Sequence, residues 1–132
     1  PLKSPKGKYI HVVYSASGVW TPYYALGMLT ADTNADLLDP ASWKKSPQPL
    51  FRQSPKNGVY GTGHNSFFKS PDGKEHYILY HARDTQTDPP GMGDTRSPRT
   101  QKIEWKADDY PVFGTPYPKS TRLKKPSGTV VK

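Results

Sequence analysis

The stretch that decides the fold occurs twice in this chain, as KSPKGKYIHVVYSA at residues 3–16 and, 66 positions later, as KSPDGKEHYILYHA at residues 69–82. Seven of these 14 positions are identical. Each copy opens with a Pro–x–Gly–Lys turn, in which Pro presets one backbone dihedral and Gly accepts a positive φ. The apolar, β-branched and aromatic run that follows is typical of a strand buried on both faces. The two copies predict a duplicated turn-and-strand unit.

Further strand candidates surround each copy. Residues 23–30 follow the first copy, residues 100–105 follow the second, and residues 67–68 mark a strand just before the second turn. A unit of this length with several antiparallel strands matches one blade of a β-propeller, and propellers typically need four to eight blades. We therefore expect an all-β chain of antiparallel sheets that forms part of a propeller, with repeat units near residues 3–60 and 61–118.

The charge of the chain is unevenly distributed. Nineteen Lys and Arg against 11 Asp and Glu give a net charge of +8, and residues 119–132 contribute five cations and no acid. Such a tail can bind nucleic acid through phosphates, but the rest of the chain is nearly balanced and basic termini are commonly solvated. We expect residues 119–132 to form a basic C-terminal tail that makes few contacts, and we expect no nucleic-acid partner.

The composition excludes several classes of protein and site. The chain has no apolar run near the ~20 residues that cross a bilayer, so we expect no membrane partner. It has no cysteine, which excludes a disulfide scaffold and a Cys-ligated zinc or iron–sulfur site. The first residue is Pro rather than Met, so we expect a processed chain or a fragment.

His64 has the most unusual setting of the four histidines, within the Gly-rich stretch GTGHNS at residues 61–66, which we expect to lie directly before a strand. Glycines allow the backbone to approach a ligand or to turn sharply, and His offers a nitrogen for a metal or a hydrogen bond. A structural role for His64 is the alternative. We expect His11, His76 and His81 to be packing residues, because they lie in or beside the repeated strands.

A long loop rich in Pro, Gly and Asp follows the second copy and carries the remaining candidates. Hydrolysis of a glycosidic bond needs two carboxylates across the sugar, and Asp84, Asp88 and Asp94 can supply them only if folding brings two of them together. We expect instead that these residues bond their own backbone. Arg96 and Arg99 are either solvated or hold a sugar hydroxyl or a carboxylate in a fixed orientation.

Five motifs, in order along the chain, resemble glycoside hydrolase family 43. They are YSASGVWTPYYALG (14–27), DPASW (39–43), GTGHNS (61–66), RSPRTQKIEW (96–105) and FGTP (113–116). The resemblance covers nearly all of residues 3–118 and is nearest to the exo-acting α-L-arabinofuranosidases, with β-xylosidases next. It implies a five-bladed propeller that hydrolyses arabinose- or xylose-containing polysaccharides with inversion, in which this chain forms about the fourth and fifth blades.

The resemblance also implies which site residues lie in this chain. The three catalytic carboxylates of the family come from segments outside it, and Pro1 is the last residue of the element that carries the acid Glu, so we assign no catalytic residue. His64 matches a His at a central water or calcium site on the propeller axis. Arg96 matches an Arg that contacts the sugar, Arg99 also fits the arabinofuranosidase pattern, and Trp20 lies near the pocket rim, where it stacks on a sugar or packs.

Two functions are compatible with these residues. The first is the C-terminal part of a secreted hydrolase of arabinose- or xylose-containing polysaccharides, to which this chain supplies pocket residues but no catalytic carboxylates. The alternative is a non-catalytic carbohydrate-binding or assembly module whose free sheet edges pair with the missing blades or with another copy of the chain. Asp109 stands where the family often has Gly, and we expect this difference to alter only a turn.

Overall fold

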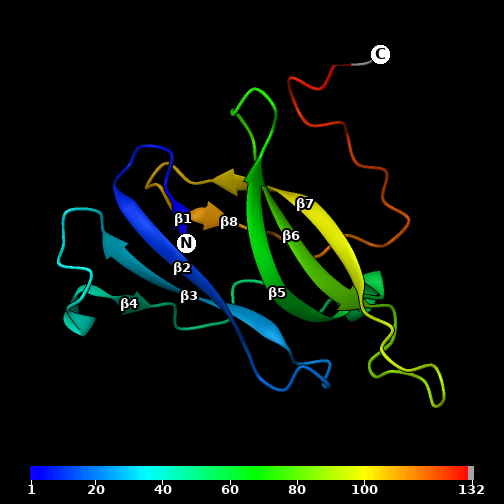
Figure 1. Cartoon of the computed structure of the whole chain (residues 1–132). Helices are drawn as coiled ribbons and strands as arrows, with labels where there is room; N and C mark the ends of the chain where they lie inside the picture. Colours follow the sequence, from blue (N-terminus) through cyan, green and yellow to red (C-terminus); the bar gives the residue numbers. More distant parts are fainter. Residues whose placement is uncertain (131–132) are drawn as a thin grey trace.

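The computed structural model of the chain describes residues 1–130 and confirms an all-β fold of two four-stranded antiparallel sheets (Figure 1). The first sheet contains β1 (Leu2–Lys3), β2 (Tyr9–Ala16), β3 (Ala25–Asp32) and β4 (Lys44–Lys45). The second contains β5 (Tyr60–Lys69), β6 (His76–Arg83), β7 (Ser97–Trp105) and β8 (Pro111–Val112). The two helices of the described residues are single 3₁₀ turns at Pro40–Ser42 and Pro55–Asn57, and neither has the length to cross a membrane.

The sequence repeat is a repeat of strand register. Leu2 of β1 pairs with His11 of β2, and the residues 66 positions later, Phe68 of β5 and Tyr77 of β6, pair in the same way. Strands follow one another in space in the order of the sequence in both sheets. The two copies therefore build two equivalent sheets, as predicted; the unit boundaries near residues 60 and 118 stay a prediction.

The two repeated strands differ in burial. β6 is mostly buried, with Leu79 as its one exposed residue, but in β2 only His11 is fully buried. The prediction of burial on both faces is therefore wrong for β2, which is also an edge strand over most of its length, because its neighbour β1 has two residues and the rest of β2 pairs only with β3. β6, in contrast, lies between the ten residues of β5 and the nine residues of β7.

The core lies between the two sheets and is centred on Phe51, which belongs to the segment that links them. Phe51 bridges to Leu26 of β3, and its ring meets that of Tyr80 in β6 edge-on, with 4.8 Å between centroids. The other buried members of this cluster are Leu2, Val59, Ile78, Ala82, Ile103 and Phe113. Each buried side chain of this size contributes about 1.5–3 kcal/mol, so this cluster holds the sheets together.

Asp109, in the turn between β7 and β8, makes a second connection between the sheets. Its φ of 70° lies in the left-handed region, which Asp tolerates better than most residues. The Asp109 carboxylate accepts hydrogen bonds from the backbone N–H groups of Lys6 (3.2 Å) and Lys8 (3.4 Å), and His11 Nε2 lies 3.3 Å from the Asp109 carbonyl oxygen. The expectation that Asp at this position alters only a turn is therefore wrong.

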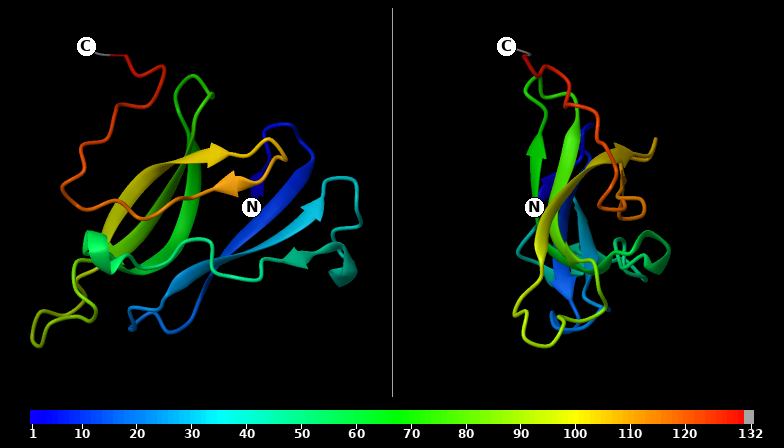
Figure 2. Two further views of the ribbon diagram at one scale, coloured as in Figure 1. Left: turned by 180° about the vertical axis from the view of Figure 1, so that it is seen from behind. Right: turned by 90° about the vertical axis from the view of Figure 1, so that its right-hand side faces the viewer.

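The C-terminal segment runs along the side of the second sheet that faces away from the first sheet (Figures 1 and 2). Lys119 Nζ lies 2.8 Å from Asp84 in the loop after β6, and Ser127 bonds two carboxylates of the second repeat turn. The expectation of few contacts is wrong at these two points, although residues 120–125 between them are exposed. Residues 131–132, which belong to the predicted tail, lie outside the described residues.

Candidate functional site

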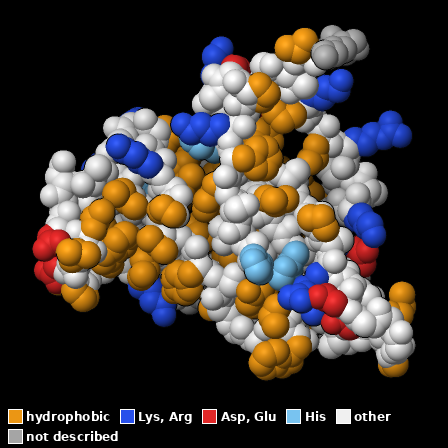
Figure 3. All heavy atoms as spheres, in the orientation of Figure 1, with side chains coloured by type: hydrophobic (Ala, Val, Ile, Leu, Met, Phe, Trp, Pro, Cys, Tyr) orange, Lys and Arg blue, Asp and Glu red, His pale blue; other side chains and the backbone are white. Residues whose placement is uncertain are grey.

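The candidate site lies where the loops at one end of the two sheets meet, in the lower part of Figure 1. At this end residues 17–24 join β2 to β3, and residues 84–96 join β6 to β7. A cavity of about 370 Å³ opens here, and it is lined by His64, Leu79, Tyr80, His81, Asp94, Arg96, Ser97 and Pro98. Figure 3 shows histidine side chains beside basic and acidic side chains on this face. The cavity thus combines hydrogen-bonding groups with a size suited to one small ligand.

The Gly-rich motif that carries His64 lies inside β5 rather than before a strand, which corrects the sequence prediction. β5 and β6 shift register on both sides of Gly63, and Gly61 and His64 have φ values of 61° and 52°. Such bulges re-aim side chains, and positive φ is uncommon for a residue other than Gly. The His64 N–H donates to Ser15 Oγ at 2.7 Å, which leaves the His64 side chain exposed at the cavity.

His81, at the end of β6, lies between two aromatic rings in the same cavity. Its ring stacks on Tyr24 at 5.6 Å and an angle of 22°, and the His64 ring lies 5.9 Å away on a tilted plane. Gly63 makes this arrangement possible, because a Cβ at that position would lie 2.2 Å from Tyr24 Cε1. Burial, reinforced by the positive charge of Arg96, lowers the pKa of His81 to about 4, so its ring is neutral at pH 7.

Arg96 lines the same cavity as the two histidines and forms an ion pair with Asp94. Arg96 Nε lies 2.7 and 2.8 Å from the two carboxylate oxygens of Asp94, and Arg96 Nη2 also donates to this carboxylate. These hydrogen bonds lower the pKa of Asp94 to about 2. The guanidinium is thereby held in one orientation at the cavity, while its role in contacting a sugar stays a prediction.

Trp20 lies on the loop between β2 and β3, outside the set of residues that line the cavity. Its side chain is 73% exposed, and Tyr23 on the same loop is 69% exposed. The Trp20 ring lies against Gly18, where a Cβ would come within 2.9 Å of Cε2. An exposed, locally supported indole is suited to stacking on a sugar, which stays a prediction for Trp20.

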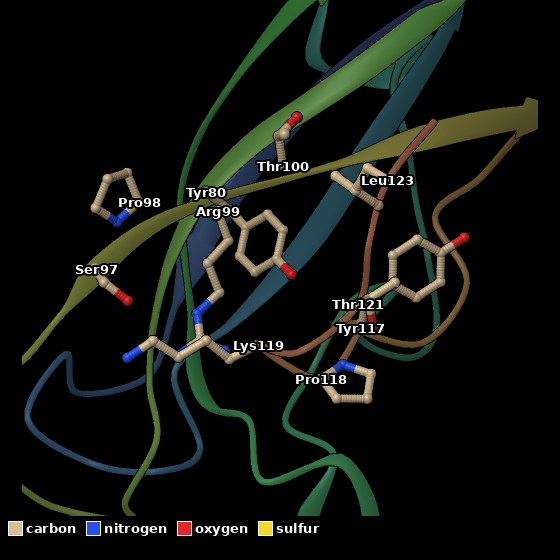
Figure 4. Close-up of a pocket in the computed structure, with 10 residues that line it drawn as sticks. All are labelled: Tyr80, Ser97, Pro98, Arg99, Thr100, Tyr117, Pro118, Lys119, Thr121 and Leu123. Atoms are coloured by element: carbon tan, nitrogen blue, oxygen red, sulfur yellow. The ribbon is translucent and has the colours of Figure 1, made fainter. Parts of the chain in front are cut away.

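Arg99 lies in a neighbouring cavity of about 250 Å³, not in the one that contains Arg96 (Figure 4). In this second cavity Arg99 lies beside Tyr80 and Lys119, and its Nη2 donates to Asp84 at 2.6 Å. Arg96 belongs to the loop, whereas Arg99 is the third residue of β7 and points toward the C-terminal segment. The structure therefore separates the two arginines that the sequence pairs, and substrate binding by Arg99 stays a prediction.

The three acids of the long loop are all bound by cations. Asp84 accepts from Lys119 and Arg99, Asp88 from Arg83, and Asp94 from Arg96. These hydrogen bonds lower the pKa of each carboxyl group, so all three are ionised at neutral pH. The local backbone bond expected from the sequence exists beside the ion pair for Asp94, which accepts the N–H of Arg96, whereas Asp88 accepts the N–H of Thr95 across the loop. An ionised, cation-bound carboxylate cannot donate the proton that glycoside hydrolysis needs.

The described residues do not fit a calcium ion by themselves. Calcium takes six to eight oxygen ligands, and within residues 1–130 no three His, Asp or Glu side chains gather closely enough to hold a metal ion. Asp94, the acid that lines the cavity with His64, is already bound to Arg96. Clustered carboxylates of the described residues therefore do not supply a calcium site, and calcium at this position stays a prediction.

Sequence reasoning missed two residues of the cavity region, Tyr24 and His81. The sequence predicts a packing role for His81 because it lies in a repeated strand, but a strand end that leads into a long loop is also where a pocket forms. Tyr24 gave no local signal, because its contacts are with residues of the other sheet, Gly63 and His81.

Known proteins resemble this chain in sequence and fold. Residues 4–111 match the family model described as glycosyl hydrolases family 43. The chain is 47% identical over 119 residues to an extracellular exo-alpha-(1->5)-L-arabinofuranosidase of Streptomyces avermitilis, and the matched region covers 88% of this chain and 24% of the relative. It is 41% identical over 112 residues to alpha-L-arabinofuranosidase B of Pyricularia oryzae, and this matched region covers 83% of this chain and 23% of the relative. The chain thus spans about a quarter of the length of the curated relatives it matches.

Solved structures agree with this match. The crystal structure of an alpha-L-arabinofuranosidase from Lactobacillus brevis superimposes with a TM-score of 0.79 and 37% identity, over 87% of this chain and 36% of that one. A thermostable family-43 glycoside hydrolase gives a TM-score of 0.74 with 26% identity, over 92% of this chain and 36% of that one. Because the family match covers most of residues 1–132 and agrees with the two antiparallel sheets, the chain belongs to glycoside hydrolase family 43.

Proposed function

We propose that this chain supplies part of the sugar-binding wall of an α-L-arabinofuranosidase-type hydrolase of arabinose-containing polysaccharides. The observation that carries the proposal is the cavity in which Arg96, His64 and His81 converge at the loop end of the second sheet. Two relatives that cover most of the chain are named as arabinofuranosidases. Xylose-containing substrates are the runner-up, since both sugars are pentoses.

The reaction is acid–base hydrolysis with inversion, in which a protonated acid and an ionised base stand ~6.5–9.5 Å apart on opposite sides of the sugar. In this mechanism Arg96 binds and orients the sugar, with Asp94 fixing its guanidinium. Neutral His81 and the exposed His64 offer hydrogen-bonding nitrogens to hydroxyl groups. The acid and the base come from the rest of the enzyme, because the acids of the long loop are bound to cations.

We further propose that the enzyme acts outside the cell, as the name of the Streptomyces avermitilis relative states for that protein. Its partners are then a soluble or cell-wall polysaccharide and the remaining blades of the propeller. The unpaired length of β2, beyond its two-residue neighbour β1, favours the alternative of an assembly module that pairs with another copy.

The test is a chimaera in which residues 4–111 replace the matching segment of the Streptomyces avermitilis relative. We expect it to hydrolyse an aryl α-L-arabinofuranoside, and Arg96→Ala to lower kcat/KM by about 100-fold or more, because a misplaced sugar loses transition-state contacts. Lys74→Met, which removes an exposed cation at the opposite end of the second sheet, is the control and leaves kcat/KM unchanged. A folded chimaera without activity, or an Arg96→Ala variant as active as the control, contradicts the proposal.

A further inference from the structure

Arg83, the last residue of β6, connects the two loops at the cavity end of the molecule. Its side chain is 3% exposed. Arg83 Nε and Nη2 donate to the two carboxylate oxygens of Asp88 at 2.8 and 3.0 Å, and Arg83 Nη1 donates to the carbonyl oxygen of Val19 at 3.0 Å. One buried guanidinium thus holds the loop after β6 and the loop after β2 at the same time.

Asp88 also binds the segment that carries Arg96. Besides the two bonds from Arg83, the Asp88 carboxylate accepts the backbone N–H of Thr95 at 2.8 Å and the Thr95 hydroxyl at 2.7 Å. Thr95 directly precedes Arg96. Charge-assisted, two-pronged bonds of this kind are stronger and more directional than neutral ones, so the position of Arg96 depends on Asp88.

On the other side, Val19 directly precedes Trp20, and the same loop rests on Gly61. The Gly61 N–H donates to the Pro22 carbonyl oxygen at 3.2 Å. A Cβ at Gly61, where φ is +61°, would lie 3.1 Å from Arg83 Nη1. The first glycine of the Gly-rich motif therefore leaves the space through which Arg83 reaches the Trp20 loop.

We infer that Arg83 is a positioning residue that couples the Trp20 loop to the Arg96 loop, so that both side chains meet one sugar in a fixed relation. The inference rests on the proposed function for the roles of Trp20 and Arg96, but the coupling itself is a property of the fold. Lysine cannot replace Arg83, because a single ammonium group cannot reach both oxygens of Asp88 and the carbonyl of Val19 with the same geometry.

The coupling is tested in the 132-residue chain by nuclear magnetic resonance, with the indole N–H of Trp20 as the reporter. Asp88→Asn keeps the shape of the side chain but removes its charge, and the hydrogen-bond partners of Asp88 are Arg83 and Thr95 rather than any residue of the loop after β2. We expect this change to move the Trp20 indole signal by more than its linewidth, because Arg83 loses its anchor. Lys74→Met, the matched control, leaves that signal in place. Signal changes in Asp88→Asn that are confined to the long loop overturn the inference.

The functional consequence is tested by a double-mutant cycle in the chimaera defined above. Asp88→Asn and Arg83→Lys each lower kcat/KM by roughly 10- to 100-fold while the melting temperature stays above the assay temperature. Trp20→Ala lowers kcat/KM in the unmodified chimaera and lowers it by a smaller factor in the Asp88→Asn background, because the indole is already misplaced there. A purely structural role for Arg83 gives equal losses from Trp20→Ala in both backgrounds, and this result overturns the inference.

The two experiments separate the two ideas. An unmodified chimaera that folds but has no activity contradicts the proposed function, and the inference is then decided by the Trp20 indole signal alone. An active chimaera with additive losses contradicts the coupling and leaves the proposed function intact.

Discussion

The two ends of this molecule treat the internal repeat differently. At the end with the two repeated turns, Ser4 and Ser70 bond the residue five positions later in the same way: their N–H groups donate at 3.0 and 2.9 Å and their hydroxyl oxygens accept at 2.8 and 2.9 Å. Gly7 and Gly73 share a φ of 74°. At the other end, residues 17–24 and 84–96 have no such correspondence. The repeat is kept where turn chemistry sets the fold and lost where the candidate site lies.

The turn end also differs in what each turn binds. The first turn offers its backbone N–H groups to the carboxylate of Asp109 from the second sheet. The second turn offers two carboxylates, Asp72 and Glu75, to Ser127 of the C-terminal segment. The two turns therefore have the same internal hydrogen bonds but bind different partners, because the side chains of the two turns differ. We expect substitutions at the cavity end to change activity, and substitutions at the turn end to change only stability or local order.

The largest effect is expected at the cavity end for Gly63→Ala. The added methyl group would overlap the Tyr24 ring and displace Tyr24 from its stack on His81. Overpacking of this kind costs roughly 1–3 kcal/mol, and we expect the chimaera to lose most of its activity as well. Denaturant unfolding and hydrolysis rates measure the two effects. The matched control is Gly63→Ala made in a Tyr24→Ala background, where the added methyl group meets no ring and lowers the free energy of unfolding less. If Gly63→Ala lowers the free energy of unfolding equally with and without Tyr24, the contact between residue 63 and Tyr24 is contradicted.

A smaller effect is expected at the first turn for Asp109→Gly. Glycine adopts the positive φ readily, so the change removes the carboxylate that bonds Lys6 and Lys8 without adding backbone strain. We expect a lower melting temperature and unchanged kcat/KM in the chimaera. Asp108→Gly, at the exposed neighbouring position, is the control and lowers the melting temperature less. If Asp109→Gly lowers kcat/KM, the expectation that substitutions at the turn end change only stability or local order is wrong.

The smallest effect is expected at the second turn, as a local release of the C-terminal segment in acid. Hydrogen bonds from Ser70 and Ser127 lower the pKa of Asp72 to about 2, and bonds led by the Ser127 N–H lower that of Glu75 to about 2. Both values lie below those of the free side chains, so the stabilisation is complete at neutral pH and is lost as the pH falls toward 2. The Ser127 amide signal should move with a midpoint near pH 2 while the Trp20 indole signal stays in place. Release of Ser127 already at pH 5 contradicts this assignment.

The sequence predicted the sheets because their signals are local. A Pro–x–Gly–Lys turn followed by an alternating or apolar run specifies a turn and a strand within about 14 residues, and the structure confirms both copies. Asp109 could not be placed in this way, because its partners Lys6 and Lys8 lie about a hundred residues earlier.

The site was predicted only in part for a related reason. His64 and Arg96 were identified by motif, and the structure brings them to one cavity. Arg99 matches the same motif but belongs to the next cavity, because residues of the C-terminal segment close one side of that cavity and local patterns do not position this segment. Tyr24, His81 and Arg83 make their contacts across loops or sheets, so no sequence spacing indicated them.

We expect residues 1–132 to contribute binding groups but not the acid and the base of the reaction. Hydrolysis of an aryl α-L-arabinofuranoside by the 132-residue chain, measured beside the chimaera at equal concentration, tests this claim most directly. We expect no turnover by the chain and clear turnover by the chimaera, because the acids at the cavity end are ionised and bound to Arg83, Arg96 and Arg99, so that none of them can protonate the leaving group. Turnover by the chain alone that disappears when Asp84, Asp88 or Asp94 is changed to Asn would show a complete active site within these residues and contradict the account.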